Sequence, residues 1–143
     1  MKTKLQSLLH HLISNPKQIF LIDGFGALVT TFSLAVVLVI FESHFGMPRK
    51  ILYILSFAAC IFAIYSFSCA LRMPEKWQPF LKAIAIMNFM YCCATFFLLY
   101  YFYENLTILG LTYFILEIIV ILILVKIEFM LATKTFNINT TKN

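Results

Sequence analysis

Charged residues are scarce in this chain, and the residue patterns of common catalytic and metal sites are absent from it. Asp, Glu, Lys and Arg make up 12% of the sequence, where soluble domains carry about 25%. The three histidines, His10, His11 and His44, lie outside the long apolar runs, which argues against a haem or metal held by histidines inside a membrane. The four cysteines form no C-x-x-C motif, which argues against a disulfide-generating enzyme and a zinc site. The sequence therefore predicts neither an enzyme nor a cofactor.

Long apolar runs are what the chain has instead. Hydrophobic residues make up 62% of its 143 positions, and the mean hydropathy is +0.93. Four runs, at 19–41, 51–71, 79–103 and 106–127, each approach or exceed the ~20 residues that cross a bilayer as a helix. Prolines at the starts of helices and short connections favour antiparallel neighbours. We predict an all-α, four-helix transmembrane bundle, with 1–143 as one membrane domain.

The two ends of the chain differ from its middle. Within 2–14, leucine and isoleucine recur at helical spacing and polar residues take the other positions, which is typical of an amphipathic helix lying in the membrane interface. We interpret this segment as part of the mature protein, because the apolar run after it is too long for a signal peptide. Residues 133–143 are polar, and we expect them to form a flexible tail.

The basic residues predict how the chain is oriented. Cytoplasmic loops of membrane proteins carry an excess of Lys and Arg. Placing both termini in the cytoplasm puts nine of the eleven basic residues on that side, with only Arg49 and Lys50 opposite. We expect a plasma membrane protein with cytoplasmic termini. The net charge of +5 reflects these flanking residues, and no basic domain outside the membrane predicts nucleic-acid binding.

Small residues predict how the helices pack. Between helices in lipid, close approach through small side chains and interhelical hydrogen bonds replaces the hydrophobic effect. The second run carries such a seam, at Ser56, Ala59, Ala63, Ser66 and Ala70, with alternating spacings of three and four. The third run repeats the pattern around Ala85 and Cys92, and the first carries several glycines. We expect these faces to meet and the bulky faces to contact lipid.

Glu117 lies near the middle of the last run, and an ionisable residue at that depth needs a partner. Counting from the turn at Glu104 and Asn105 places it level with residue 92. We predict a polar layer that joins Glu117 to four neighbours, which are Asn88, Thr95, Tyr91 and Thr31. Because burial disfavours a charged carboxylate, we expect Glu117 to be neutral and to donate a hydrogen bond. The layer either holds the helices in register, handles protons or cations, or faces a partner in an oligomer.

A second polar cluster is predicted at the cytoplasmic side. Asp23 lies one turn into the first run, and Lys82 enters the third run at a similar depth. Arg72 and Lys76 are nearby in the connection. One interpretation is an interfacial Asp23–Lys82 ion pair that fixes helix packing. The alternative is a site for an anionic headgroup or substrate, built on the three basic residues.

Several segments carry a family resemblance: Phe20-Leu-Ile-Asp-Gly-Phe-Gly-Ala27, Phe45-Gly-Met-Pro48, Tyr91-Cys-Cys93, and Leu106-Thr-Ile-Leu-Gly-Leu-Thr-Tyr113 leading to Glu117. Over about 17–128 the chain resembles small four-span membrane proteins of bacteria. The resemblance implies a location in a bacterial inner membrane, and it brings no activity with it.

Two functions remain open from the sequence. The first is a non-enzymatic structural or accessory component of a membrane, whose short loops leave only lipid, a second copy or another membrane protein as partners. The alternative is a small oligomeric transporter or proton-coupled carrier in which Glu117 is the coupling carboxylate. The sequence supplies no substrate for it.

Overall fold

The computed structural model describes residues 2–140, and that part of the chain is helical with short connections and no strand. The elements in order are α1 (Lys2–Ser14), α2 (Pro16–Phe32), the π-helical segment η1 (Ser33–Leu38), α3 (Glu42–Phe45), α4 (Arg49–Arg72), α5 (Gln78–Tyr101) and α6 (Ile108–Thr140). Among these residues, four helical stretches are long and apolar enough to cross a membrane: Pro16–Leu38, Arg49–Arg72, Gln78–Tyr101 and Ile108–Thr133. The predicted all-α bundle with four spanning helices is confirmed.

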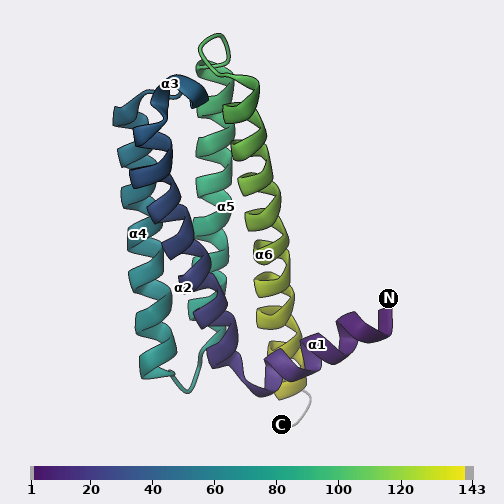
Figure 1. The fold of residues 1–143 in the computed structure, drawn as a ribbon. Helices are drawn as coiled ribbons and strands as arrows, with labels where there is room; N and C mark the ends of the chain where they lie inside the picture. Colours follow the sequence, from purple (N-terminus) through teal and green to yellow (C-terminus); the bar gives the residue numbers. More distant parts are fainter. Residues whose placement is uncertain (1, 141–143) are drawn as a thin grey trace.

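The bundle consists of two helix pairs laid side by side. Figure 1 shows α2 running along α4 and α5 running along α6, with α3 and the α5–α6 turn at one end. The first and last described residues lie at the opposite end, where α1 crosses the base of the bundle beside α6. The small-residue seam predicted for α4 is buried at all five positions. The matching face of α5 is buried too, so these faces form the interior as expected.

Proline marks where three of the helices begin. Pro16 is the first residue of α2, Pro48 precedes α4, and Pro79 is the second residue of α5. These positions suit proline because the first helical residues have no intrahelical acceptor for an N–H group. The boundaries differ from the predicted ones at the other end of the chain. There α6 continues to Thr140, past the expected end at 127 and into the segment predicted as a flexible tail, of which 141–143 lie outside the described residues.

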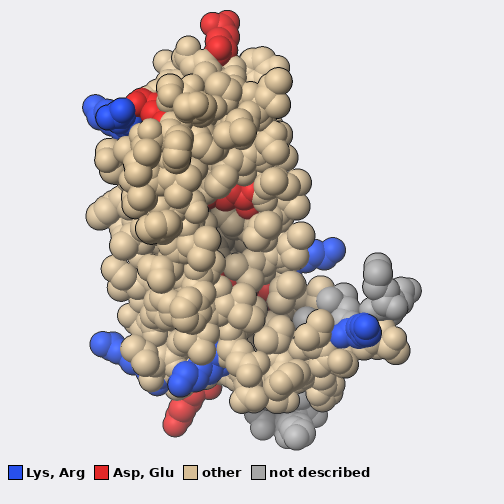
Figure 2. All heavy atoms as spheres, in the orientation of Figure 1, with Lys and Arg blue, Asp and Glu red and all other residues tan. Residues whose placement is uncertain are grey.

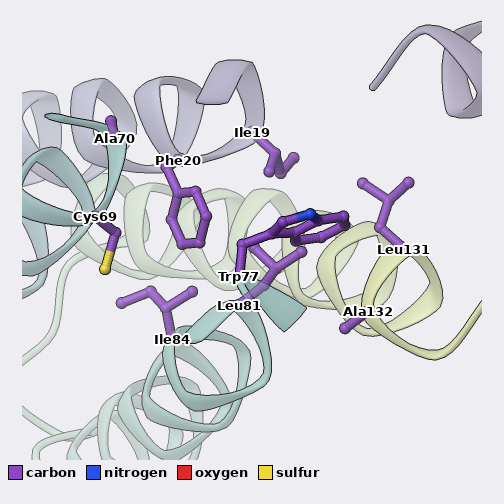
Figure 3. Close-up of a cluster of buried hydrophobic side chains, with 9 residues drawn as sticks. All are labelled: Ile19, Phe20, Cys69, Ala70, Trp77, Leu81, Ile84, Leu131 and Ala132. Carbon is purple, nitrogen blue, oxygen red and sulfur yellow. The ribbon is translucent and has the colours of Figure 1, made fainter. Parts of the chain in front are cut away.

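Two apolar clusters close the bundle near its ends. At the end that carries the termini, Phe20, Trp77 and Leu81 pack with side chains from α4 and α6, as Figure 3 shows. At the α3 end, Leu34, Leu52 and Phe114 belong to a second buried cluster. The outer faces of the four helices instead carry many exposed aromatic and aliphatic side chains, which is the surface expected against lipid.

The connection around α3 is fastened to the start of α6. The Thr107 hydroxyl donates a hydrogen bond to the His44 carbonyl and accepts one, at 3.1 Å, from the backbone N–H of Gly110. The Thr107 backbone N–H donates to the Phe45 carbonyl at 3.3 Å. Thr107 therefore satisfies an N–H group in the first turn of α6 and ties that turn to α3 at the same time.

An ion pair secures the start of α4. The Glu42 carboxylate accepts a hydrogen bond from the backbone N–H of Arg49 at 3.1 Å and forms a salt bridge with the Arg49 side chain. These bonds favour the ionised carboxylate and hold the pKa of Glu42 below its usual value. The pair lies at the surface, so it orders the connection more than it stabilises the fold.

Gly46 should be the most sensitive glycine in this chain. Its φ of +78° lies in the left-handed region, and a Cβ added there would collide with the backbone carbonyl of Asn105. We expect Gly46→Ala to lower the free energy of unfolding by at least about 1–2 kcal/mol, the cost of the left-handed conformation alone. Unfolding in mixed detergent micelles, followed by circular dichroism, measures the change.

Gly26→Ala is the matched control, because a Cβ at Gly26 meets nothing within 4 Å. Its free energy of unfolding should stay within about 0.5 kcal/mol of the parent or increase slightly, since alanine favours a helix. Equal effects of the two substitutions would contradict the close approach described for Gly46.

Candidate functional site

One residue from each spanning helix contributes to a polar cluster inside the bundle. Asp23 of α2 accepts a hydrogen bond from Ser66 of α4 and one, at 2.7 Å, from the Asn88 amide of α5. Glu128 of α6 lies within hydrogen-bonding reach of Asp23 and beside Asn88. All four side chains are buried, and Asp23 and Glu128 are 2% and 0% exposed. We call these four residues the carboxyl cluster.

The two carboxyl groups of this cluster differ in their donors. Both oxygens of Asp23 accept hydrogen bonds, from Ser66 and Asn88. Neither oxygen of Glu128 receives a bond of normal geometry from an N–H or O–H donor, although both are buried. A carboxyl next to another carboxyl can bond to it only when one of the two carries a proton. Of the two acids, Asp23 is therefore the one whose charged form the surrounding donors stabilise.

Glu117 belongs to a second site further toward the α3 end. The Tyr91 hydroxyl donates to Glu117 Oε1 over 3.3 Å, while Oε2 is buried without a hydrogen-bond partner. Tyr113, one turn earlier on α6, lies within reach of Ser33 in η1. Glu117 is 9% exposed and has Tyr91 as a polar partner inside the bundle, but it accepts this bond where a donating carboxyl was expected, and its neutral form stays a prediction.

A small, partly open cavity lies between these two sites. Its volume is about 70 Å³, and its walls include Asp23, Thr30, Asn88 and Tyr91 together with apolar residues of α2, α4 and α6. A space of this size admits more than one water molecule, and the four polar side chains offer the hydrogen bonds that a buried water needs. The cavity therefore connects the carboxyl cluster with the hydroxyl that holds Glu117.

Glu117 also lines a groove on the outside of the bundle. The groove runs between α2 with η1 and α6, encloses about 530 Å³, and is walled mostly by apolar side chains such as Phe25, Val29 and Leu116. Figure 2 shows acidic atoms within the cleft between these helices, while the basic side chains gather toward the ends of the molecule. Glu117 is the only charged residue in the lining, so one carboxyl sits between an apolar groove and the interior.

The predicted polar layer forms only in part. Tyr91 bonds to Glu117 as expected, but Asn88 bonds to Asp23 instead, because it lies one turn nearer the termini. Thr95 is fully buried near the Tyr91 hydroxyl, yet within the described chain its own oxygen has no hydrogen bond of normal geometry.

Thr31 is outside the layer altogether. Its hydroxyl donates to the Ala27 carbonyl of its own helix at 2.8 Å, and its carbonyl accepts from Ser56 of α4 at 3.0 Å. The physical reason is the pairing of the helices, since this face of α2 packs on α4 and not on α6. A depth count gives the level of a residue but not its direction around the helix.

The structure shows the surroundings of the predicted cytoplasmic-side charge cluster. Asp23 is buried, with Ser66, Asn88 and Glu128 as the neighbours described above. Arg72 and Lys76 are exposed around the α4–α5 connection, and Lys82 is half-buried in the first turns of α5. The seam of α4 offers Asp23 a hydroxyl at its depth, and the Asp23–Lys82 ion pair stays a prediction.

Glu128 is the functional candidate that the sequence analysis missed. It lies beyond the predicted end of the last run and therefore reads as a flanking charge. Its spacing from Glu117 is eleven residues, which is about three helical turns, so the two acids share one face of α6. That periodicity is the signal that predicts an inward Glu128.

Known proteins give no further guide to the site. Comparisons with protein-family models, with curated proteins and with solved structures found no match to this chain. Within residues 2–140, no group of three or more His, Cys, Asp or Glu side chains could hold a metal ion.

Ser66 should contribute to stability through Asp23. Ser66→Ala removes a donor from a buried carboxylate, and such a loss costs about 1–3 kcal/mol of unfolding free energy. Ser68→Ala is the control, since Ser68 is exposed and bonds only to the Ile64 carbonyl of its own helix. Both values come from unfolding in mixed micelles. Equal stabilities of the two variants would contradict the Ser66–Asp23 bond.

Proposed function

We propose that this chain is a small proton-coupled carrier of the plasma membrane, in which Glu117 binds either a proton or a lipophilic cation. The observation that carries this proposal is the position of Glu117. One of its oxygens accepts a bond from Tyr91, and the other is buried without a partner at the edge of an apolar groove. A carboxyl placed in this way attracts a ligand that brings positive charge and tolerates apolar walls.

The substrate class follows from the groove. Six of its ten lining residues are apolar and the others are Glu117, Thr30, Ser33 and Tyr113, so a strongly hydrated ion would lose water there with few replacement ligands. A lipophilic cation loses little hydration and gains contact with the aromatic and aliphatic walls. Exchange conserves charge, because the carboxyl releases one proton when one monovalent cation binds.

Orientation and partners belong to the same proposal. The excess of Lys and Arg around the end that carries the termini favours placing that end in the cytoplasm of a bacterial cell. The groove opens sideways toward lipid, so a substrate can enter from the bilayer. A second copy packed over the groove would close it, which makes a homo-oligomer the expected form.

A second candidate function is the accessory role, in which the groove receives a helix of another membrane protein. The open side of the groove favours this candidate too, because small residues such as Gly26 and Ser33 permit close approach of a helix. In that case Glu117 would hold the partner by a hydrogen bond and would not titrate during function.

Glu117→Gln separates the two candidates. Glutamine keeps the hydrogen bonding but cannot release a proton. We expect vesicles that contain the parent chain to exchange internal protons for added tetraphenylphosphonium. The exchange rate with the Glu117→Gln chain should be at least about tenfold lower. A pH-sensitive dye inside the vesicles measures the exchange.

Glu75→Gln is the matched control, since Glu75 is exposed in the α4–α5 connection and should leave the rate unchanged. Equal exchange rates in the parent and Glu117→Gln chains would overturn the carrier proposal. An unchanged rate together with a lost oligomer or partner complex would instead support the accessory role.

A further inference from the structure

Asp23 and Glu128 form a pair of buried acids that Glu117 exchange does not explain and that helix packing alone does not require to be acids. Both are more completely buried than Glu117, and they approach each other from helices in different pairs of the bundle. Hydrogen bonds that merely fix helix packing need only neutral groups such as Asn or Ser. Two acids at one point, where one amide would do, indicate a site for something positively charged.

The surroundings of the pair permit only one negative charge. Two carboxylates in contact inside a low-dielectric interior repel each other too strongly for both to be ionised. Ser66 and Asn88 direct their donors at Asp23, which stabilises its charged form. Glu128 has no such donor on either oxygen, so we place the proton of the pair on Glu128, next to Asp23.

We propose that Asp23 and Glu128 form a second acid site, which binds one exchangeable proton between the two carboxyl groups. This site is distinct from Glu117 and lies across the water-sized cavity from Tyr91. The apolar cluster of Phe20 and Trp77 packs residues that neighbour the pair along α2 and α6, on the side of the termini. A proton that reaches the pair therefore comes through the cavity or through local opening of this cluster.

Other ionisable groups on the same helices enter the test of the pair. On α4, Cys69 is one turn from Ser66 and interacts with Tyr65. On α5, Lys82 is half-buried, and on α6, Lys126 is exposed. Lys82 is the less exposed of these two cations, so a Lys82→Gln variant belongs in the experiment.

The experiment counts the titration steps of the pair by infrared spectroscopy. The parent is the full chain with Glu117→Gln, purified and reconstituted in phosphatidylcholine vesicles, so that Glu117 makes no contribution. The protonated carboxyl band is followed from acid to alkaline pH. Two coupled steps are expected from the pair, because it takes up a second proton in acid and releases the first in alkali.

Removal of either acid should leave one step. Asp23→Asn and Glu128→Gln are close in shape to the originals, and each leaves a lone carboxyl with a single titration. Either variant is sufficient if the other does not fold. Lys82→Gln should keep both steps. Glu104→Gln is the control for exposed acids and should change neither step of the pair.

Three results would overturn the proposal. The first is a pair band that does not titrate, which would mean a permanently neutral hydrogen bond. The second is a band that changes with NaCl but not with choline chloride at constant pH, which would assign the site to sodium. The third is an ionised pair that gains a proton only in Lys82→Gln, which would assign it to an ion pair. None of these outcomes depends on Glu117 exchange.

Discussion

The hydrogen bonds to the Asp23 carboxylate hold this bundle together across its weakest contact. The chain folds as two tight pairs, α2 with α4 and α5 with α6, and the space between the pairs contains the cavity and the groove. Ser66 binds Asp23 within the first pair, whereas Asn88 and Glu128 reach it from the second. In lipid such bonds contribute about 0.6–2 kcal/mol each. The hydrogen bonds to Asp23 therefore fix how the two helix pairs are positioned relative to each other.

The π-helical segment η1 borders the groove. A π-helix has more residues per turn than an α-helix and frequently occurs at functional sites. Here it follows α2 at Ser33, which lines the groove together with Tyr113 and Glu117. The backbone irregularity therefore coincides with the candidate site.

Hydropathy and small-residue spacing are enough to predict the four helices, their antiparallel order and their buried faces. They also predict the inward direction of Glu117 and its bond to Tyr91. They do not predict which helices form pairs, because the small-residue seams look alike on several helices. Without the pairing, Thr31 was placed in the wrong layer, and Asp23 was assigned a partner at the interface. Glu128 was missed because an acid near the end of an apolar run resembles a flanking charge.

The presence of several acids in the interior distinguishes a binding role from a packing role more clearly than the position of any single acid does. A buried carboxyl is costly, and an amide supplies similar hydrogen bonds without that cost. Asn88 already shows that this bundle uses an amide where a neutral group is sufficient. Asp23 nevertheless lines the cavity, Glu128 lies next to Asp23, and Glu117 is bonded to Tyr91 on the cavity wall. What distinguishes an acid from an amide in such a place is its ability to exchange a proton, which is the reason for proposing proton binding here.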